Sequence, residues 1–300
     1  MDVSTVGFIG LGQMGYGMAK NLLRSGVGLV VCDLDARRVN DLVEAGAESA
    51  AIPAEVSDCV EIVFVCVPSE SDSEDVLFGS QGVTRTEKEL LVVDMTTMSY
   101  TGSQRLSRKL NNLAVLYNDC PVSGLPARAN DGTLTMMFGG SVENFSRVKC
   151  YLDVMGKFVI HCGDVGMGQL MKAVNNIVYD VNIAALCEVM PLAVKAGLAP
   201  EKLSEVLTTA SARSFASTHF VPRILEREFT EDFSLVAAHK DIVNIRQLAE
   251  EHKATLPVVN AMVAIYEAAI EMGMGEEAKS AMVKVYERRF EQKVKASLEV

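Results

Sequence analysis

Three polar side chains, Lys172, Asn175 and Asn176, interrupt an otherwise apolar segment that runs from about residue 166 to 197. A periodic run of that length predicts a buried helix, on which positions i, i+3 and i+4 cover one patch of the surface. An amine and two amides on a buried face need polar partners, because an unpaired buried amine is costly. A polar ligand would supply these partners. The alternative is a lysine that extends its amine to solvent beside two asparagines that bond neighbouring loops.

A glycine-rich motif near the start of the chain indicates a dinucleotide site. The short apolar run Val6–Ile9 predicts a buried strand, and it leads directly into G-x-G-x-x-G and a helical pattern. In this context the first glycine allows a tight turn, the second lets the backbone approach the pyrophosphate, and the third lets the helix pack on the strand. A glycine-rich turn that binds nothing is the alternative. The motif consists of Gly10, Leu11, Gly12, Gln13, Met14 and Gly15.

The next apolar run, Leu29–Cys32, is followed by Asp33, about 20 residues past the glycine motif, where a ribose-binding carboxylate is expected. Asp33 would accept hydrogen bonds from the ribose hydroxyls and repel a 2′-phosphate. The following residue is Leu34 rather than a cation. Arg37 and Arg38 fall in the next predicted helix, where they offset only part of that repulsion. The sequence therefore favours NAD over NADP.

Two more apolar runs, at residues 61–67 and 90–94, predict further buried parallel strands. The loops at the carboxyl ends of such strands line the ligand crevice of an open parallel sheet. Pro68, Ser69 and Thr97 lie in these loops and are candidate cofactor contacts. The same residue types are also common in turns and at helix N-termini. Strands near residues 115–118, 132–140 and 159–163 are expected to complete the sheet.

A chain of 300 residues is long for one hydrophobic core, so two domains are expected. The alternation of strands and helices predicts a Rossmann-type α/β domain with a mostly parallel sheet over residues 1–163. Residues 164–300 show only helical patterns, which predict an all-α substrate and oligomerisation domain joined to the first by the long helix. Residues 235–253 form one amphipathic pattern, and the charged residues after Glu287 predict a solvated helical extension.

The net charge of −11 argues against nucleic acid and an anionic membrane surface as partners, since both need clustered cations. The long apolar segment carries too many polar side chains for a membrane span. The seven cysteines include no C-x-x-C pair, which favours buried free thiols in a reducing cytoplasm. The histidines include no H-x-x-x-H pair, so no metal site is expected. A cytoplasmic location is also expected because the start lacks a signal-peptide pattern.

The motifs resemble, in order along the chain, those of the β-hydroxyacid dehydrogenases. This family contains 3-hydroxyisobutyrate dehydrogenase, tartronate semialdehyde reductase and the glyoxylate/succinic semialdehyde reductases. The resemblance extends from about residue 6 to 287. It is carried by the glycine motif with its helix and by the segments 94–97, 121–124, 132–134, 168–176 and 239–241.

The resemblance implies that Lys172 is the catalytic lysine and Asn176 its substrate-binding neighbour. Lys172 would take the proton of a hydroxyl as hydride leaves the carbon, and return it in the reverse direction. A lysine base has to lose its own proton near neutral pH, which burial and neighbouring cations favour. Asn176 would bond and orient the same oxygen, with Asn175 as a further candidate substrate contact.

The resemblance also implies that Ser123 and Gly124 bind the substrate carboxylate, and that Thr97 and Lys240 contact the nicotinamide end of the cofactor. Family members commonly carry a second glycine after Ser-Gly, whereas this chain has Leu125. Its bulk is expected to change which substrates fit. Arg128 is either a further anion contact or a solvated loop residue.

The predicted function is NAD-dependent hydride transfer between nicotinamide and a small β-hydroxy acid, or its semialdehyde or keto form. The partner is therefore a small anionic hydroxy acid or aldehyde, and the family implies a homodimer or homotetramer. One alternative is an NADPH-linked reductase of a short semialdehyde or of glyoxylate. Another is a catalytically inactive dinucleotide-binding scaffold.

Overall fold

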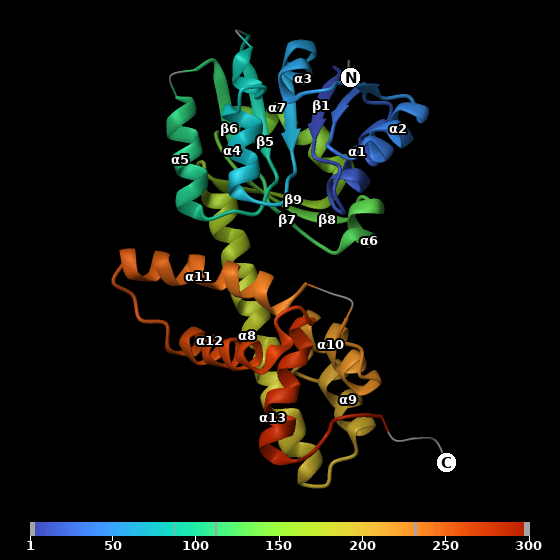
Figure 1. The fold of residues 1–300 in the computed structure, drawn as a ribbon, viewed down its shortest axis with the longest axis vertical. Coiled ribbons are helices and arrows are strands. Elements are labelled where there is room, and N and C mark those ends of the chain that lie inside the picture. Colours follow the sequence, from blue (N-terminus) through green and yellow to red (C-terminus); the bar gives the residue numbers. More distant parts are fainter. Residues whose placement is uncertain (1–3, 87, 112, 231–232, 297–300) are drawn as a thin grey trace. The chain divides into compact units, whose positions relative to one another are not determined.

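The computed structural model describes residues 4–86, 88–111, 113–230 and 233–296, apart from the side chains at 240, 241, 244 and 247. The chain divides between residues 172 and 173 into two compact units, an α/β unit and a helical unit (Figure 1). The division falls inside helix α8 (Met167–Lys195). The domain ranges expected from the sequence, 1–163 and 164–300, stay a prediction.

One mostly parallel sheet forms the centre of the α/β unit. Its strand order is β3-β2-β1-β4-β5-β6-β8-β7, with β9 paired to β8. From β3 to β6 all neighbours are parallel, whereas β8 runs antiparallel to β6 and β7. The strands are β1 (Val6–Ile9), β2 (Leu29–Cys32), β3 (Glu48–Ser49), β4 (Ile62–Val65), β5 (Leu90–Asp94), β6 (Val115–Asp119), β7 (Val122–Ser123), β8 (Leu134–Gly139) and β9 (Gly156–Gly163).

Both faces of this sheet are covered, which explains why its central strands are apolar without alternation. One hydrophobic core joins the sheet to α1, α2, α6 and α7, and a second joins its other face to α3, α4 and α5. The helices are α1 (Gly15–Arg24), α2 (Ala36–Glu44), α3 (Pro53–Cys59), α4 (Glu70–Phe78), α5 (Tyr100–Leu110), α6 (Pro126–Asn130) and α7 (Val142–Met155), with the short 3₁₀ helix η1 (Val83–Arg85). The predicted Rossmann-type α/β class is confirmed.

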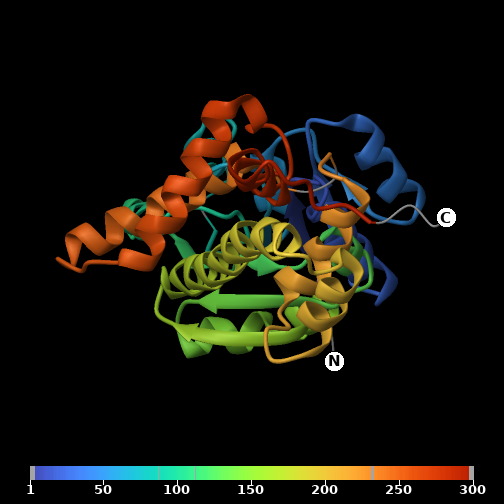
Figure 2. The ribbon, with the colours of Figure 1, turned by 90° about the horizontal axis from the view of Figure 1, so that it is seen from below.

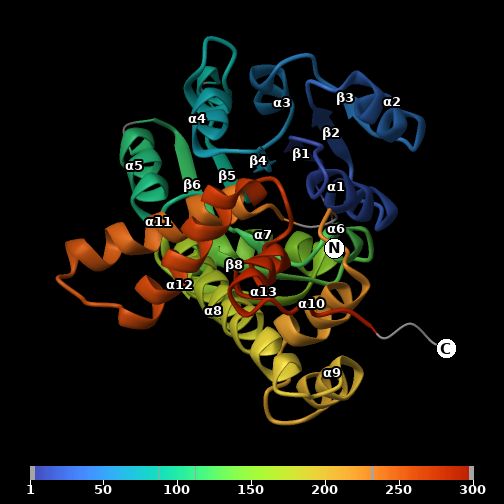
Figure 3. The ribbon, with the colours of Figure 1, turned by 60° about the horizontal axis from the view of Figure 1, so that its bottom comes forward.

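The helical unit is built along α8. Helices α9 and α10 lie to one side of α8, and α11 and α12 lie to the other (Figures 2 and 3). Pro191 lies inside α8 without ending it. The remaining elements are α9 (Pro200–Thr209), α10 (Phe215–Glu226), α11 (Leu235–Glu251), α12 (Pro257–Ala269), η2 (Ile270–Met274), η3 (Lys279–Met282) and α13 (Val283–Phe290).

The expectation that α8 is a buried helix holds for one face only: Ile183, Cys187 and Met190 are buried, whereas the opposite face is exposed in this single chain. By length and composition the helix could cross a membrane, yet only 39% of its most apolar window is buried. Met171, Val174 and Val178 are 44%, 48% and 58% exposed, and Val189 and Leu192 continue the same stripe. Apolar composition predicts that a face is covered, but it does not say that the same chain covers it.

Two smaller expectations are also corrected. The tail is not a solvated helical extension, because α13 ends at Phe290 and the chain folds back to bury Val294. Arg227 holds this segment, since its guanidinium donates to the carbonyl of Val294 at 3.0 Å and pairs with Glu287. The cysteines are free, but Cys59 and Cys150 are exposed rather than buried.

Candidate functional site

The glycine motif forms a tight loop between β1 and α1. Gly10 has φ +92°, and a Cβ there would lie 2.2 Å from the carbonyl oxygen of Cys66. A Cβ at Gly15 would lie 2.0 Å from the carbonyl oxygen of Gly10, so only glycine fits at either position. At Gly12 a Cβ would meet nothing within 4 Å, which leaves the backbone open on the side where a phosphate would lie. The loop therefore fits a dinucleotide pyrophosphate.

The carboxylate of Asp33 accepts two main-chain hydrogen bonds, one of which comes from this loop. It accepts from the N–H of Leu11 at 2.5 Å and from the N–H of Asp35 at 2.7 Å. The side chain of Leu34 is fully exposed. The structure thus brings Asp33 to the loop, at the end of β2, where an adenosine ribose would lie.

The two arginines of α2 have different positions. Arg37 pairs with Asp35 at 3.2 Å, whereas the guanidinium of Arg38 donates to the carbonyl of Leu11 at 2.5 Å. Arg38 therefore lies at the glycine loop, on the same residue, Leu11, whose N–H donates to Asp33.

The loops after β4 and β5 are joined by Thr96, whose hydroxyl accepts from the N–H of Val67 at 3.1 Å. Ser69 follows Pro68 and caps α4, and its hydroxyl accepts from the N–H of Asp72 at 3.2 Å. Thr97 is exposed between two buried neighbours. The candidate cofactor contacts Pro68, Ser69 and Thr97 thus lie in loops at the carboxyl ends of adjacent parallel strands.

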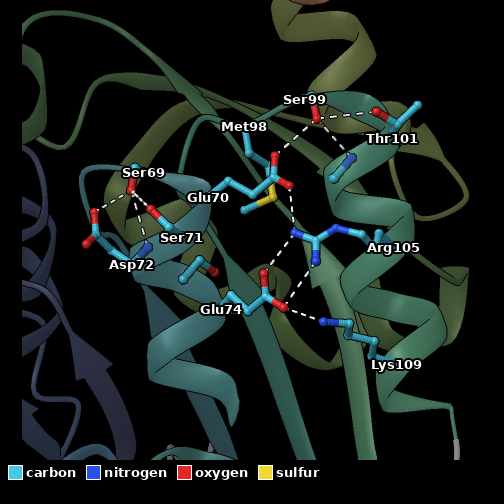
Figure 4. A network of polar contacts seen from close by, with 12 residues as sticks. Ser69, Glu70, Ser71, Asp72, Glu74, Met98, Ser99, Thr101, Arg105 and Lys109 are labelled. Carbon is cyan, nitrogen blue, oxygen red and sulfur yellow. Dashed lines mark hydrogen bonds and ion pairs between the residues drawn. The ribbon is translucent and has the colours of Figure 1, made fainter. Parts of the chain in front are cut away.

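An ion-pair network supports these loops from α4 and α5. Figure 4 shows Arg105 between the carboxylates of Glu70, at 2.8 Å, and Glu74, at 2.9 Å. Lys109 also pairs with Glu74, and Glu70 accepts a hydrogen bond from Ser99, the N-cap of α5. The network therefore connects α4 to α5, the two helices that follow the loops with the candidate cofactor contacts.

Because of this network, the free energy of unfolding should fall at acidic pH. The side-chain hydrogen bonds from Arg105 and Lys109 lower the pKa of Glu74 from 4.5 to about 2. A lowered pKa in the folded state adds stability above the unfolded value, and this stability is lost as pH falls from about 4.5 toward 2. We expect Glu74→Gln to lower the free energy of unfolding by about 1 kcal/mol at pH 6.

The difference between Glu74→Gln and wild type should shrink at pH 3, measured by urea unfolding at both pH values. Asp153→Asn is a matched control, because it removes an exposed i, i+4 pair with Lys149 and should cost less at pH 6. A Glu74→Gln effect that is equal at both pH values would contradict the assignment.

The N-terminus of α8 is anchored by Asp119 at the end of β6. Its buried carboxylate accepts from the N–H of Gly166 at 2.5 Å and from the N–H of Gln169 at 2.8 Å. Burial raises the pKa of Asp119 to about 7, although these two hydrogen bonds favour the charged form. Burial also raises the pKa of Asp94, which bonds Ser73, Thr96 and Tyr117.

Lys172 lies on the second turn of α8 and is half-buried. Its amine donates to the carbonyl of Val122 at 2.7 Å, directly before Ser123 and Gly124. The structure therefore brings together the predicted catalytic lysine and the predicted carboxylate-binding pair. Gly124 has φ +144°, which favours glycine.

Leu125 is compatible with the loop, because its φ of −79° is ordinary and it precedes Pro126 at the start of α6. Its side chain is 38% exposed. The guanidinium of Arg128 is not simply solvated, since it donates to the carbonyl of Thr133.

The other predicted residues lie in the helical unit. Asn176 is half-buried, one turn after Lys172, whereas Asn175 is exposed and donates to Asn176 at 3.3 Å. Asn175, at i+3 from Lys172 and next to Asn176 in the sequence, therefore stands at the exposed edge of the patch that these two side chains share. The side chain of Lys240 lies outside the described residues.

Two residues of this arrangement were not predicted from the sequence: Gln169, within the segment 168–176, and Asp119, directly after the strand expected near 115–118. Gln169 is 1% exposed and lies three residues before Lys172, on the same face of α8. The sequence does carry a signal for Gln169, because it is a polar residue three positions before the candidate catalytic lysine in an apolar segment. No cluster of three or more His, Cys, Asp or Glu side chains that could hold a metal ion occurs among the described residues.

Known proteins and protein families are similar to this chain over almost its whole length. Residues 5–163 match the NAD binding domain of 6-phosphogluconate dehydrogenase, and residues 166–286 match the model described as NAD-binding of NADP-dependent 3-hydroxyisobutyrate dehydrogenase. The chain is 35% identical over 285 residues to 2-(hydroxymethyl)glutarate dehydrogenase of Eubacterium barkeri, covering 94% of this chain and 95% of that protein. It is 33% identical to 2-hydroxy-3-oxopropionate reductase of Escherichia coli, covering 94% and 97%.

Among solved structures, 3-hydroxyisobutyrate dehydrogenase from Salmonella typhimurium matches with a TM-score of 0.83 and 28% identity. The match covers 95% of this chain and 100% of that one.

Proposed function

The chain belongs to the β-hydroxyacid dehydrogenase family, whose members are NAD(P)-dependent, and from this premise we propose that it uses NAD to oxidise a small β-hydroxy acid. The reverse reaction reduces the corresponding semialdehyde or keto form. The observation that carries the proposal is the position of the Lys172 amine, 2.7 Å from the carbonyl of Val122 and next to Ser123 and Gly124.

When bound, the nicotinamide ring accepts or supplies the hydride. Lys172 takes the hydroxyl proton at its Nζ as the carbon gives up hydride, and returns it in reduction. The bond to Val122 restrains this amine beside the substrate. Ser123 and Gly124 bind the substrate carboxylate, and Asn176 orients the reacting oxygen. The adenosine half of NAD binds at Gly10–Gly15 and Asp33, and Pro68, Ser69 and Thr97 contact the remainder.

NAD reduction across a panel of short hydroxy acids tests this function, with NADP in parallel. The panel should include dicarboxylates, because one relative is named for 2-(hydroxymethyl)glutarate, and sulfonate and phosphonate analogues, because Leu125 alters the clamp. Turnover of a β-hydroxy carboxylate is the expected result. Tight NAD binding without turnover of any panel member would contradict the proposal.

The preference for NAD should depend on Asp33. Replacement by Asn removes the negative charge that repels a 2′-phosphate, while Arg38 stays at the neighbouring carbonyl of Leu11. We expect Asp33→Asn to lower the ratio of kcat/KM for NAD over NADP by roughly 10-fold or more, the equivalent of about 1.4 kcal/mol. Asp41→Asn makes the same charge change on the exposed side of α2 and should leave the ratio unchanged. An unaltered ratio in Asp33→Asn would assign the preference to another residue.

We also propose a cytoplasmic homodimer or homotetramer that packs through α8. The support is the stripe formed by Val178, Val189 and Leu192, each about half-exposed on one side of the helix. Large exposed apolar surfaces on soluble chains mark interfaces. Light scattering gives the mass in solution, and a monomer at micromolar concentration would contradict this part of the proposal.

A further inference from the structure

The side chain of Gln169 forms two hydrogen bonds, one on each side of Thr97. Its amide oxygen accepts from the N–H of Met98 at 3.1 Å, and its amide nitrogen donates to the carbonyl of Thr96 at 2.7 Å. In a parallel sheet, one residue bonds the neighbouring strand in the same way, through the carbonyl before and the N–H after the residue opposite it. A single side chain therefore holds the backbone of Thr97 as an added strand would.

This arrangement leaves Thr97 in a defined position. Thr96 and Met98 are buried, and Thr97 between them is exposed. Thr96 is held on its other side as well, because its N–H donates to Asp94 at 3.0 Å and its hydroxyl accepts from Val67. The loop after β5 thus has little freedom as long as Gln169 is present.

The same glutamine belongs to the helix that carries Lys172. Its own N–H donates to the carboxylate of Asp119, which fixes the first turn of α8 to the end of β6. Gln169 and Lys172 stand at i and i+3 and share one face of the helix. All of these residues belong to the α/β unit. One side chain therefore connects the loop of Thr97 to the turn of α8 that places the Lys172 amine.

We propose that Gln169 is a positioning residue that holds Thr97, and with it the nicotinamide end of the cofactor, in register with Lys172. The inference rests on the proposed NAD-dependent function. In this role Gln169 contacts neither the nicotinamide nor the substrate. It acts through its hydrogen bonds to the main chain on either side of Thr97. The adenosine end of the cofactor, bound at Gly10–Gly15 and Asp33, does not depend on it.

The first test is ligand binding, which needs no substrate. Gln169→Met keeps the length of the side chain and removes both hydrogen bonds. Calorimetric titration with NADH and with ADP-ribose, which lacks nicotinamide, separates the two ends of the cofactor. We expect ADP-ribose affinity to stay within about twofold, and NADH affinity to fall roughly fivefold or more, as the loss of about one net hydrogen bond implies.

The second test is turnover of the hydroxy acid that wild type uses. A small misplacement of reacting groups has a large effect on the chemical step. We expect Gln169→Met to lower kcat roughly 10- to 100-fold with a smaller change in KM for the hydroxy acid. Gln104→Met is the matched control, because it removes a glutamine amide of α5 that donates to the hydroxyl of Tyr100. The control should keep the wild-type kcat.

Gln169→Glu provides a rescue that a merely structural role would not show. A protonated carboxyl accepts from Met98 and donates to Thr96, whereas an ionised one cannot donate to the carbonyl of Thr96. The titratable groups of the segments joined here are Asp119, which accepts from the main-chain N–H of residue 169, Asp94, which accepts from the N–H of Thr96, and Lys172, three residues further along α8. Because Asp119 titrates in wild type too, the variant is compared with wild type at each pH. We expect the ratio of NADH to ADP-ribose affinity to recover as the pH falls from about 8 to about 6.

An unchanged affinity ratio together with wild-type kcat in Gln169→Met would overturn the inference. If that variant does not fold, the pH series of Gln169→Glu decides, and a ratio that does not vary with pH relative to wild type overturns it. Failure of the proposed function looks different. In that case wild type itself turns over no hydroxy acid of the panel, even where it binds NAD tightly.

Discussion

Lys172→Ala should abolish nearly all turnover, with kcat lower by roughly 10²- to 10⁴-fold, which is the usual contribution of a positioned acid–base group. The substitution removes the group that we propose to exchange a proton with the substrate hydroxyl. The cofactor should still bind within a few-fold of wild-type affinity, because the proposed adenosine contacts, Gly10–Gly15 and Asp33, are unchanged. Steady-state kinetics and calorimetry with NADH measure the two effects separately.

A second substitution separates proton transfer from anchoring at Lys172. Arginine can still donate to the carbonyl of Val122, but it does not lose its proton in proteins. Lys172→Arg should therefore be nearly as inactive as Lys172→Ala. Lys195→Ala is the control on the same helix, where the amine donates to the carbonyl of Phe290, and it should keep activity. Substantial kcat in either Lys172 variant would refute the acid–base assignment.

Lys279→Met should destabilise the protein strongly. Lys279 pairs with Asp180 at 2.5 Å, and their side chains are 5% and 1% exposed. The ammonium also lies over the rings of Tyr179, at 4.8 Å, and Phe233, at 5.5 Å. Removing it leaves the buried Asp180 charge without its cation, for which we expect a loss of about 3–5 kcal/mol. Urea unfolding followed by circular dichroism measures the effect.

The double variant Asp180→Leu with Lys279→Met is the informative control. Replacing both members of a buried pair by apolar side chains is often neutral, so the double variant should recover most of the lost stability. Lys202→Met removes an exposed lysine that pairs with Glu205 and should change stability by less than about 1 kcal/mol. A double variant as unstable as Lys279→Met would show that the shape of the lysine, rather than its charge balance, is what the helical unit requires.

The pair also bears on how the predicted site is supported. Asp180 lies on α8 one turn after Asn176, which in turn lies one turn after Lys172. Lys279 therefore attaches the polar face of this helix to η3, beyond the residues expected to meet the substrate.

The sequence by itself determined the features whose partners are neighbours along the chain. The turn at Gly10, the closure at Gly15 and the acid Asp33 at the end of β2 all follow from one strand–turn–helix–strand unit. Their geometry depends on local sterics and on spacing that a single sequence displays. The strands at 6–9 and 90–94 were likewise predictable, because buried parallel strands are continuous apolar runs. Two-residue strands such as β3 and β7 leave no such signal.

The tertiary structure decided the contacts between distant segments. The amide of Gln169 meets Thr96 across 73 residues, Lys172 meets Val122 across 50, and Lys279 meets Asp180 across 99. No periodicity links such positions, because their proximity depends on the order of strands in the sheet and on helix packing. For the same reason, the sequence predicts that the apolar stripe of α8 is covered, but it does not indicate which chain covers it. Composition records that a surface avoids water, and only the packed structure shows whether the same chain covers it.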